Sequence, residues 1–218
     1  MKREPKLKTP QQTPKAILFD WDNTVVDTRS VVLNALNKAL KQLNKPIVED
    51  YINTAGRAEF FKQSFGGDWE YANEVFNNYL RHESIQSIQD IRIFPGFVEL
   101  LDYINENGIF TGIVSNKSGE LLRKEIEALG LTNNFDVAVG SGDTDQDKPS
   151  AKPLLYALSG SGISPSENDV TFIGDSIIDM ECAKNASVRG VIYGSPGICS
   201  YDNIPVIYHY GHAKSILF

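Results

Sequence analysis

Short runs of apolar residues that end in polar residues are the feature that most limits how this chain can fold. Residues 16–19, Ala-Ile-Leu-Phe, form such a run, and the run ends at Asp20. A short apolar run bounded by polar residues is typical of a central strand that is buried on both faces. Beyond residue 94, further runs of this kind alternate with helical patterns of apolar residues.

This alternation predicts the order of the elements after residue 94. Predicted strands cover residues 109–114, 135–139, 170–173, 188–193 and 206–209, and predicted helices cover residues 97–107, 119–129, 151–158 and 177–186. Strands that alternate with helices pair in parallel and carry helices on both faces of their sheet. We therefore predict an α/β fold whose core is a Rossmann-like, doubly wound parallel sheet.

The segment between residues 28 and 93 has a different character. A helical pattern over residues 31–43 is closed by Pro46, and residues 47–93 carry aromatic residues at helical spacing without a strand pattern. The pair Gly66–Gly67 divides this stretch into two helical halves. We therefore predict that residues 28–93 form a small all-helical insertion in a core made of residues 16–27 and 94–218.

The ends and the composition of the chain limit its partners. Residues 1–15 are basic and rich in Lys, Pro and Gln, which favours a disordered N-terminal arm over a targeting signal. The net charge of -7 argues against a nucleic-acid partner, and no apolar run is long enough to span a membrane. The two cysteines, Cys182 and Cys199, suit a reducing cytoplasm better than a disulfide framework.

Four polar clusters follow the predicted strands. They begin at Asp20, Ser115, Lys148 and Asp175, and ligands of doubly wound sheets bind where strands end. Asp20 and Asp22 lie two positions apart, which places both carboxylates on one side of an extended chain. Together with Asp175 they offer the hard oxygen ligands that Mg²⁺ prefers, while Lys148 and Ser115 offer a positive charge and a hydroxyl to a phosphoryl group.

In these clusters the sequence resembles the haloacid dehalogenase-like hydrolase superfamily. Its four motifs are an Asp-x-Asp-x-Thr, a Ser or Thr after a strand, a Lys and a Gly-Asp-x-x-x-Asp. They are matched in order by Asp20, Asp22 and Thr24, by Ser115, by Lys148, and by Gly174, Asp175 and Asp179. One motif alone would be a weak signal, but four in this order are a strong one.

The resemblance implies a role for each matched residue. Asp20 is expected to attack phosphorus and form an aspartyl-phosphate, and Asp22 to protonate the leaving group and then activate water. Mg²⁺ is expected to bind Asp20, Asp175 and the main-chain carbonyl of Asp22. Ser115 and Lys148 are expected to hold the phosphoryl oxygens, and Asn116, more readily than Lys117, to touch phosphate. Thr24 is expected to hold together the loop after the first strand, and Asp179 to orient the metal ligands.

The resemblance also implies that the helical insertion is a cap that closes over the site and selects the substrate. Gly56–Arg57 and Phe65–Gly66 resemble elements of the phosphoglycolate phosphatase-like branch. Arg57 would then hold a carboxylate at the non-reacting end of the substrate. The alternative is that Arg57 is an ordinary surface residue of a helix.

The leading prediction is a phosphatase that acts on a small phosphorylated metabolite, with 2-phosphoglycolate as the first candidate, in a monomer or homodimer. Asp22 argues against phosphonate-cleaving and dehalogenase members, which lack or do not need it. A sugar phosphomutase is the alternative, although residues 27–32 lack the His that such members usually carry. A non-catalytic binding protein on this scaffold is a third possibility. Taken singly, each motif also has a purely structural alternative, such as a turn, a helix N-cap at Ser115 or an exposed helical carboxylate at Asp179.

Overall fold

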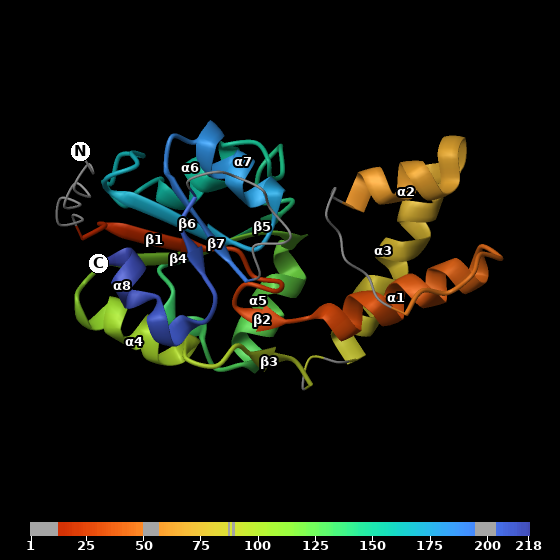
Figure 1. The fold of residues 1–218 in the computed structure, drawn as a ribbon, viewed down its shortest axis with the longest axis horizontal. Helices are drawn as coiled ribbons and strands as arrows, with labels where there is room; N and C mark the ends of the chain where they lie inside the picture. The colour runs from red at the N-terminus through yellow and green to blue at the C-terminus, as the bar shows by residue number, and fades with distance from the viewer. Residues whose placement is uncertain (1–12, 50–56, 87, 89, 195–203) are drawn as a thin grey trace, which may run out of the picture.

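The computed structural model describes residues 13–49, 57–86, 88, 90–194 and 204–218, without the side chains of residues 57–60. Its centre is a six-stranded sheet in the order β5-β4-β1-β6-β7-β8 (Figure 1). All neighbouring strands of this sheet are parallel. The strands are β1 (Ala16–Phe19), β4 (Phe110–Ser118), β5 (Val137–Ser141), β6 (Val170–Gly174), β7 (Arg189–Tyr193) and β8 (Val206–Ile207).

The position of β1 between two apolar clusters explains why its sequence is apolar without interruption. Ile17 and Phe19 lie in one apolar cluster and Ala16 and Leu18 in another, and all four are fully buried. The first cluster includes residues of α4 (Phe97–Glu106) and α5 (Gly119–Ala128), and the second includes residues of α6 (Lys152–Leu158) and α7 (Ile177–Asn185). Helices thus cover both faces of the sheet, which confirms the predicted doubly wound α/β class.

The order of strands reverses at β1, because β4 pairs with one edge of β1 and β6 with the other. Such a switch point is where doubly wound sheets bind their ligands, at the carboxyl ends of the strands. In Figure 1 these ends point toward the helical segment described next.

The helical segment has an apolar cluster of its own. It consists of α1 (Arg29–Gln42), α2 (Arg57–Phe65), the 3₁₀ turn η1 (Gly66–Asp68) and α3 (Trp69–Gln86), which lie to one side of the sheet (Figure 1). The buried members of the cluster are Ala35, Leu36, Ala39, Leu40, Phe61, Ala72, Val75 and Phe76. This separate cluster supports the division at residues 28 and 93, which stays a prediction.

Two short strands connect the helical segment to the sheet and correct one expectation. β2 (Val26–Asp27) and β3 (Arg92–Ile93) pair antiparallel, although no strand was predicted between residues 47 and 93. Two residues are too few to show the alternation that marks a strand, so only the pairing with β2 defines β3.

Two further boundaries differ from the sequence prediction. β4 continues to Ser118 rather than ending at residue 114, and its register with β5 shifts between Val114 and Ser118. Ser118, not Ser115, caps α5, because its side chain accepts a hydrogen bond from the backbone N–H of Leu121. The chain also ends in unpredicted short turns, η3 (Tyr210–His212) and α8 (Lys214–Leu217), which are too short for a helical pattern.

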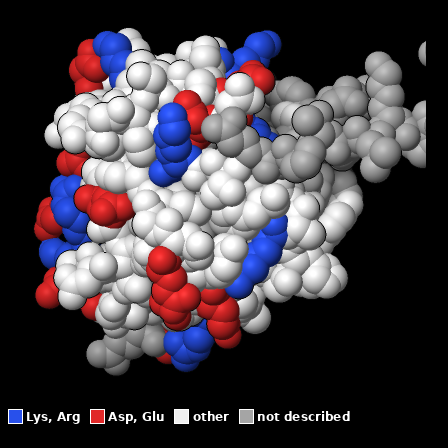
Figure 2. Space-filling view, turned by 90° about the vertical axis from the view of Figure 1, so that its left-hand side faces the viewer, with Lys and Arg blue, Asp and Glu red and all other residues white. Residues whose placement is uncertain are grey.

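The predicted disordered arm lies outside the described residues except at positions 13–15. There Pro14 is buried, and the ammonium of Lys15 lies 3.2 Å from the carboxylate of Asp169. On the face shown in Figure 2, acidic and basic side chains are interspersed, so this face presents no continuous patch of one charge. Each helix in the described part of the chain is too short or too polar to cross a membrane.

Candidate active site

The loop after β1 is fixed by hydrogen bonds to its own backbone. The backbone N–H groups of Thr24, Val25 and Val26 all donate to the carbonyl of Trp21. Asn23 adopts the left-handed region with φ of +60°, which Asn tolerates better than most residues. Such a tight loop holds Asp20 and Asp22 in a defined arrangement at the end of the central strand.

Two contacts attach this loop to its surroundings. The hydroxyl of Thr24 donates to Oδ2 of Asp20 at 3.1 Å, in line with the expected part of Thr24 in the loop. The buried hydroxyl of Tyr210, from the C-terminal η3 turn, donates to the carbonyl of Thr24 at 2.8 Å. The C-terminal segment therefore supports the loop that carries Asp20.

Lys148 lies between two of the predicted acidic residues. Its Nζ is 2.6 Å from Oδ1 of Asp20 and 2.6 Å from Oδ1 of Asp179. All three side chains are buried, so Asp179 is not the exposed helical carboxylate that remained as an alternative. The glycine before Asp175 makes this possible, because a Cβ on Gly174 would lie 2.4 Å from the Cβ of Asp179.

The side chain of Asp179 also caps the start of the helix α7. Its carboxylate accepts from the backbone N–H of Ser176, and the hydroxyl of Ser176 accepts in turn from the backbone N–H of Asp179. This reciprocal capping box uses Oδ2 of Asp179, while Oδ1 accepts from Lys148. Both oxygens of Asp179 therefore accept hydrogen bonds, and its expected role in orienting the metal ligands stays a prediction.

The carboxylates at this edge form a group that fits a cation. Asp20, Asp175 and Asp179 offer oxygens that lie within 4.8 Å of one another. Burial raises the pKa of Asp20 to about 7, with repulsion from Asp179 and Asp22 adding to this and the attraction of Lys148 opposing it. The pKa of Asp175 is also raised well above its ordinary value, first by burial and then by repulsion from Asp20 and Asp179.

These shifts have two causes in common, which are burial and the repulsion between neighbouring carboxylates. Lys148 pairs with Asp20 and Asp179, and within the described residues the carboxylate of Asp175 has neither a hydrogen bond nor an ion pair. Hard oxygen ligands around an uncompensated negative charge are what a divalent ion such as Mg²⁺ binds. The side chains of Asp20 and Asp175 are suited to hold it, whereas the side chain of Asp22 lies in another group.

The last residues of β4 include Ser115 and Asn116. Ser115 is buried, and its hydroxyl oxygen accepts from the backbone N–H of Lys117 at 3.2 Å, which leaves its own hydrogen for a ligand. The side chain of Asn116 donates to the carbonyl of Lys148 and accepts from the N–H of Lys148, both at 2.9 Å. The Asn116 side chain therefore contacts the backbone of Lys148, and its predicted contact with phosphate stays a prediction.

Lys117 belongs to a network that the sequence did not reveal. Its Nζ lies 2.7 Å from Oδ1 of Asp22 and 2.6 Å from Oε2 of Glu125 on α5. The indole N–H of Trp21 donates to the same Oε2 at 2.7 Å. A signal for Glu125 was present, because this acidic residue falls on the apolar stripe of α5 beside the buried Leu122 and Ile126.

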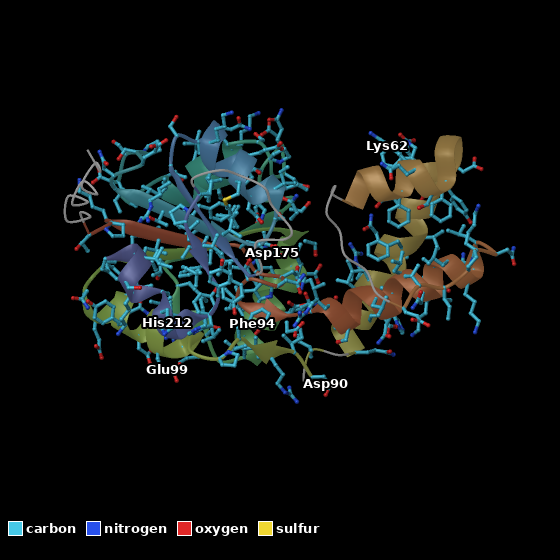
Figure 3. The ribbon with its side chains drawn as sticks, in the orientation of Figure 1. Lys62, Asp90, Phe94, Glu99, Asp175 and His212 are labelled. Carbon is cyan, nitrogen blue, oxygen red and sulfur yellow. The ribbon has the colours of Figure 1, made fainter. Side chains whose placement is uncertain are left out.

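The remaining predicted residue, Arg57, is the first residue of α2, but its side chain lies outside the described residues. The structure therefore brings together Asp20, Asp22, Thr24, Ser115, Lys148, Asp175 and Asp179 and leaves Arg57 untested. Figure 3 places Asp175 at the end of the sheet that faces the helical segment, with Lys62 of α2 farther away on that segment. The charged groups thus gather at the switch point of the sheet, on the side where the helices stand.

A comparison with models of protein families identifies the family of this chain. The model of the family described as haloacid dehalogenase-like hydrolase matches residues 17–192. The chain belongs to this family. The match spans all four motifs and the helical segment between the first and the second, so the resemblance seen in the sequence is confirmed.

Similar proteins in this hydrolase family carry the names of phosphatases. The chain is 30% identical to a phosphoglycolate phosphatase of Aquifex aeolicus, over 80% of the chain and 82% of that protein. It is 32% identical to a protein of Caldanaerobacter subterraneus provisionally named pyrophosphatase PpaX, over 81% of the chain and 80% of that protein. The crystal structure of a hydrolase of this superfamily from Ehrlichia chaffeensis superposes with a TM-score of 0.68 at 31% identity, covering 95% and 97% of the two chains.

These findings establish the class of the protein. It is an enzyme of the haloacid dehalogenase-like hydrolase family, and its relatives are phosphatases. The acidic group at the switch point fits the divalent metal that hydrolases of this family use.

Proposed function

We propose that this hydrolase is a Mg²⁺-dependent phosphatase that transfers the phosphoryl group of a small metabolite to Asp20 and then to water. The observation that carries the proposal is the convergence of Asp20, Asp175 and Lys148 at one edge of the sheet, with Lys148 within 2.6 Å of Asp20. Phosphoryl transfer requires little of a protein beyond positioning and the stabilisation of negative charge.

In the first step an oxygen of the Asp20 carboxylate forms a bond to phosphorus as the bond from phosphorus to the ester oxygen breaks. The carboxyl group of Asp22 gives its proton to the departing alkoxide. Lys148 and the hydroxyl of Ser115, both buried, would hold the phosphoryl oxygens during this step. The products are the free alcohol and a phosphorylated Asp20.

In the second step a water molecule attacks the phosphorus and gives its proton to the Asp22 carboxylate. The bond between phosphorus and the Asp20 oxygen breaks, so inorganic phosphate leaves and both aspartates return to their first state. Mg²⁺ held by Asp20, Asp175 and the carbonyl of Asp22 would supply the positive charge that the buried carboxylates lack.

For the substrate we propose a small phosphorylated metabolite, with 2-phosphoglycolate first. The phosphoglycolate phosphatase of Aquifex aeolicus supports this choice, as does the position of Arg57 at the start of a helix of the segment facing the site. We propose further that residues 28–93 act as a cap that selects the substrate, in a cytoplasmic monomer or homodimer.

The test is phosphate release from a panel of compounds with Mg²⁺ present. The panel contains 2-phosphoglycolate, inorganic pyrophosphate, hexose 1- and 6-phosphates and p-nitrophenyl phosphate. We expect release that requires Mg²⁺ and is most efficient for one small phosphomonoester. No release from any member would overturn the proposal. Conversion of a β-hexose 1-phosphate to its 6-phosphate without free phosphate would replace it with a phosphomutase.

A further inference from the structure

Lys117 and Glu125 form a buried ion pair beside one of the proposed catalytic groups. Only 6% of the Lys117 side chain and 0% of the Glu125 side chain are exposed. The second carboxylate oxygen of Glu125, Oε1, is buried without a hydrogen-bond partner among the described residues. Apolar side chains of similar size would fill this space at least as favourably, so stability alone does not account for the pair.

The pair of Lys117 and Glu125 contacts the proposed active site through one oxygen of Asp22. Lys117 donates to Oδ1 of Asp22, and the side chain of Asp22 remains 29% exposed. Across the described part of the chain, the other oxygen, Oδ2, has no hydrogen bond and no ion pair. One oxygen of the Asp22 carboxylate is thus held, and the other is available to exchange a proton.

Glu125 is in turn held by a second hydrogen bond. The indole of Trp21, which precedes Asp22 in the loop, donates to the oxygen of Glu125 that also accepts from Lys117. The network therefore joins three elements, which are the loop after β1, the end of β4 and the helix α5. Because Glu125 balances the charge of Lys117, the pair can direct Asp22 without adding a net charge beside it.

We infer that Lys117 and Glu125 are positioning residues that orient the Asp22 carboxyl group, so that Oδ2 faces the oxygen that leaves phosphorus. The inference rests on the proposed function, in which Asp22 is the acid and then the base. It assigns Lys117 to Asp22 rather than to phosphate, since its ammonium already pairs with the carboxylates of Asp22 and Glu125.

Leaving groups distinguish this role from a merely structural one. An alkoxide needs a proton as it leaves, whereas p-nitrophenolate is a stable anion and leaves without one. The value of kcat/KM reports the steps up to the first departure, so it depends on the Asp22 acid for an alkyl ester and not for the aryl ester. A disordered active site would lower both values together.

The experiment compares kcat/KM for the best alkyl phosphate of the panel and for p-nitrophenyl phosphate. The variants are Asp22→Asn, and Lys117→Met combined with Glu125→Gln, because removal of one partner alone would leave a buried charge and strongly destabilise the protein. The matched control removes an exposed pair from the same helix, Lys124→Met combined with Glu120→Gln, whose charged atoms lie 2.7 Å apart. Melting temperatures are measured for every variant.

We expect the Lys117 and Glu125 double variant to lose at least about tenfold in kcat/KM for the alkyl ester and less than about threefold for the aryl ester. Asp22→Asn should show the same selectivity with a larger loss, and the control should show neither. Equal losses for the two esters, or no loss for the alkyl ester, would overturn the positioning role while Asp22→Asn still supports the proposed function. An absence of selectivity in Asp22→Asn itself would overturn the proposed acid, and with it the inference.

Discussion

The two regions of this hydrolase are stabilised in opposite ways. At the end of the sheet, Lys148 is 3% exposed and lies between carboxylates that are also buried. In the helical segment, the interior is a cluster of apolar and aromatic side chains, and the ion pair of Lys38 with Glu83 leaves the lysine 49% exposed. Both partners of the ion pairs are thus buried where chemistry is proposed, whereas in the helical segment Glu83 is buried but its lysine partner reaches solvent.

This difference shows which part of the molecule lowers its stability and which part raises it. Burying ionised groups is unfavourable unless each has partners, and of the three carboxylates of the site Asp175 has no ion pair among the described residues. The sheet beneath them compensates, because β1 is fully buried between two apolar clusters. Substitutions in the two regions should therefore separate activity from stability.

The largest effect is expected from Asp20→Asn. Turnover should fall by at least about 10⁴-fold, because the amide cannot attack phosphorus. Without Mg²⁺ the melting temperature should stay the same or rise, since one of several repelling carboxylates is removed. Steady-state phosphate release and thermal unfolding measure the two effects. Asp145→Asn, at an exposed carboxylate, is the control and should change neither. Retained turnover in Asp20→Asn would refute the nucleophile.

Lys148→Met should affect both activity and stability. The substitution leaves Asp20 and Asp179 buried without their cation, and the loss of one partner from a buried ion pair lowers stability by about 3–5 kcal/mol. Urea unfolding measures the free energy, and phosphate release measures the accompanying loss of turnover. Lys152→Met removes a lysine that is 47% exposed and should cost less than about 1 kcal/mol. Similar losses for the two lysines would contradict the contrast between buried and exposed charges.

Phe76→Ala tests the helical segment. Removing a buried phenyl ring from a small cluster should destabilise that cluster by about 3–5 kcal/mol. If residues 28–93 are a separate unit, hydrogen exchange should quicken in α1 and α3 and remain unchanged in β1, β4 and β6. Turnover of p-nitrophenyl phosphate should fall by less than about tenfold, because Asp20 and Lys148 keep their contacts. Faster exchange throughout the sheet would show that the two regions unfold together.

The smallest effect concerns pH and Mg²⁺. Since the pKa of Asp20 is raised from 3.8 to about 7 in the folded, metal-free protein, the folded state keeps a proton that the unfolded state has lost between these values. Stability without metal should therefore fall as the pH rises from about 4 to about 7. Mg²⁺ offsets the carboxylate charge, so it should raise the melting temperature more at pH 8 than at pH 5. An equal rise at both pH values would contradict a metal site at these carboxylates.

The sequence was sufficient to predict those elements whose own residue pattern reveals how they are buried. β1 is buried on both faces, so its apolar run predicts it directly, and the four motifs predict which strand ends meet. β3 and α8 are defined by partners elsewhere in the chain and are too short to show a period. The end of β4 likewise depends on renewed pairing of Ser118 with Ser141 of β5.

The same limit applies to the site. Asp20, Lys148 and Asp175 could be predicted because each follows its own strand, and parallel strands end at one edge. Trp21 and Glu125 lie 104 positions apart, and nothing local indicates that they share an oxygen with Lys117. The burial of Asp179 depends on the missing Cβ of Gly174, which a motif records but does not explain.

The central claim is that Asp20 becomes phosphorylated, and a rapid-mixing experiment with Asp22→Asn tests it most directly. With p-nitrophenyl phosphate this variant can form the intermediate without an acid but lacks the base that breaks it down. The account predicts a burst of about one p-nitrophenolate per enzyme molecule and, after acid quenching, a phosphate on the peptide that contains Asp20. Steady release without a burst, or a phosphate on any other residue, would contradict it.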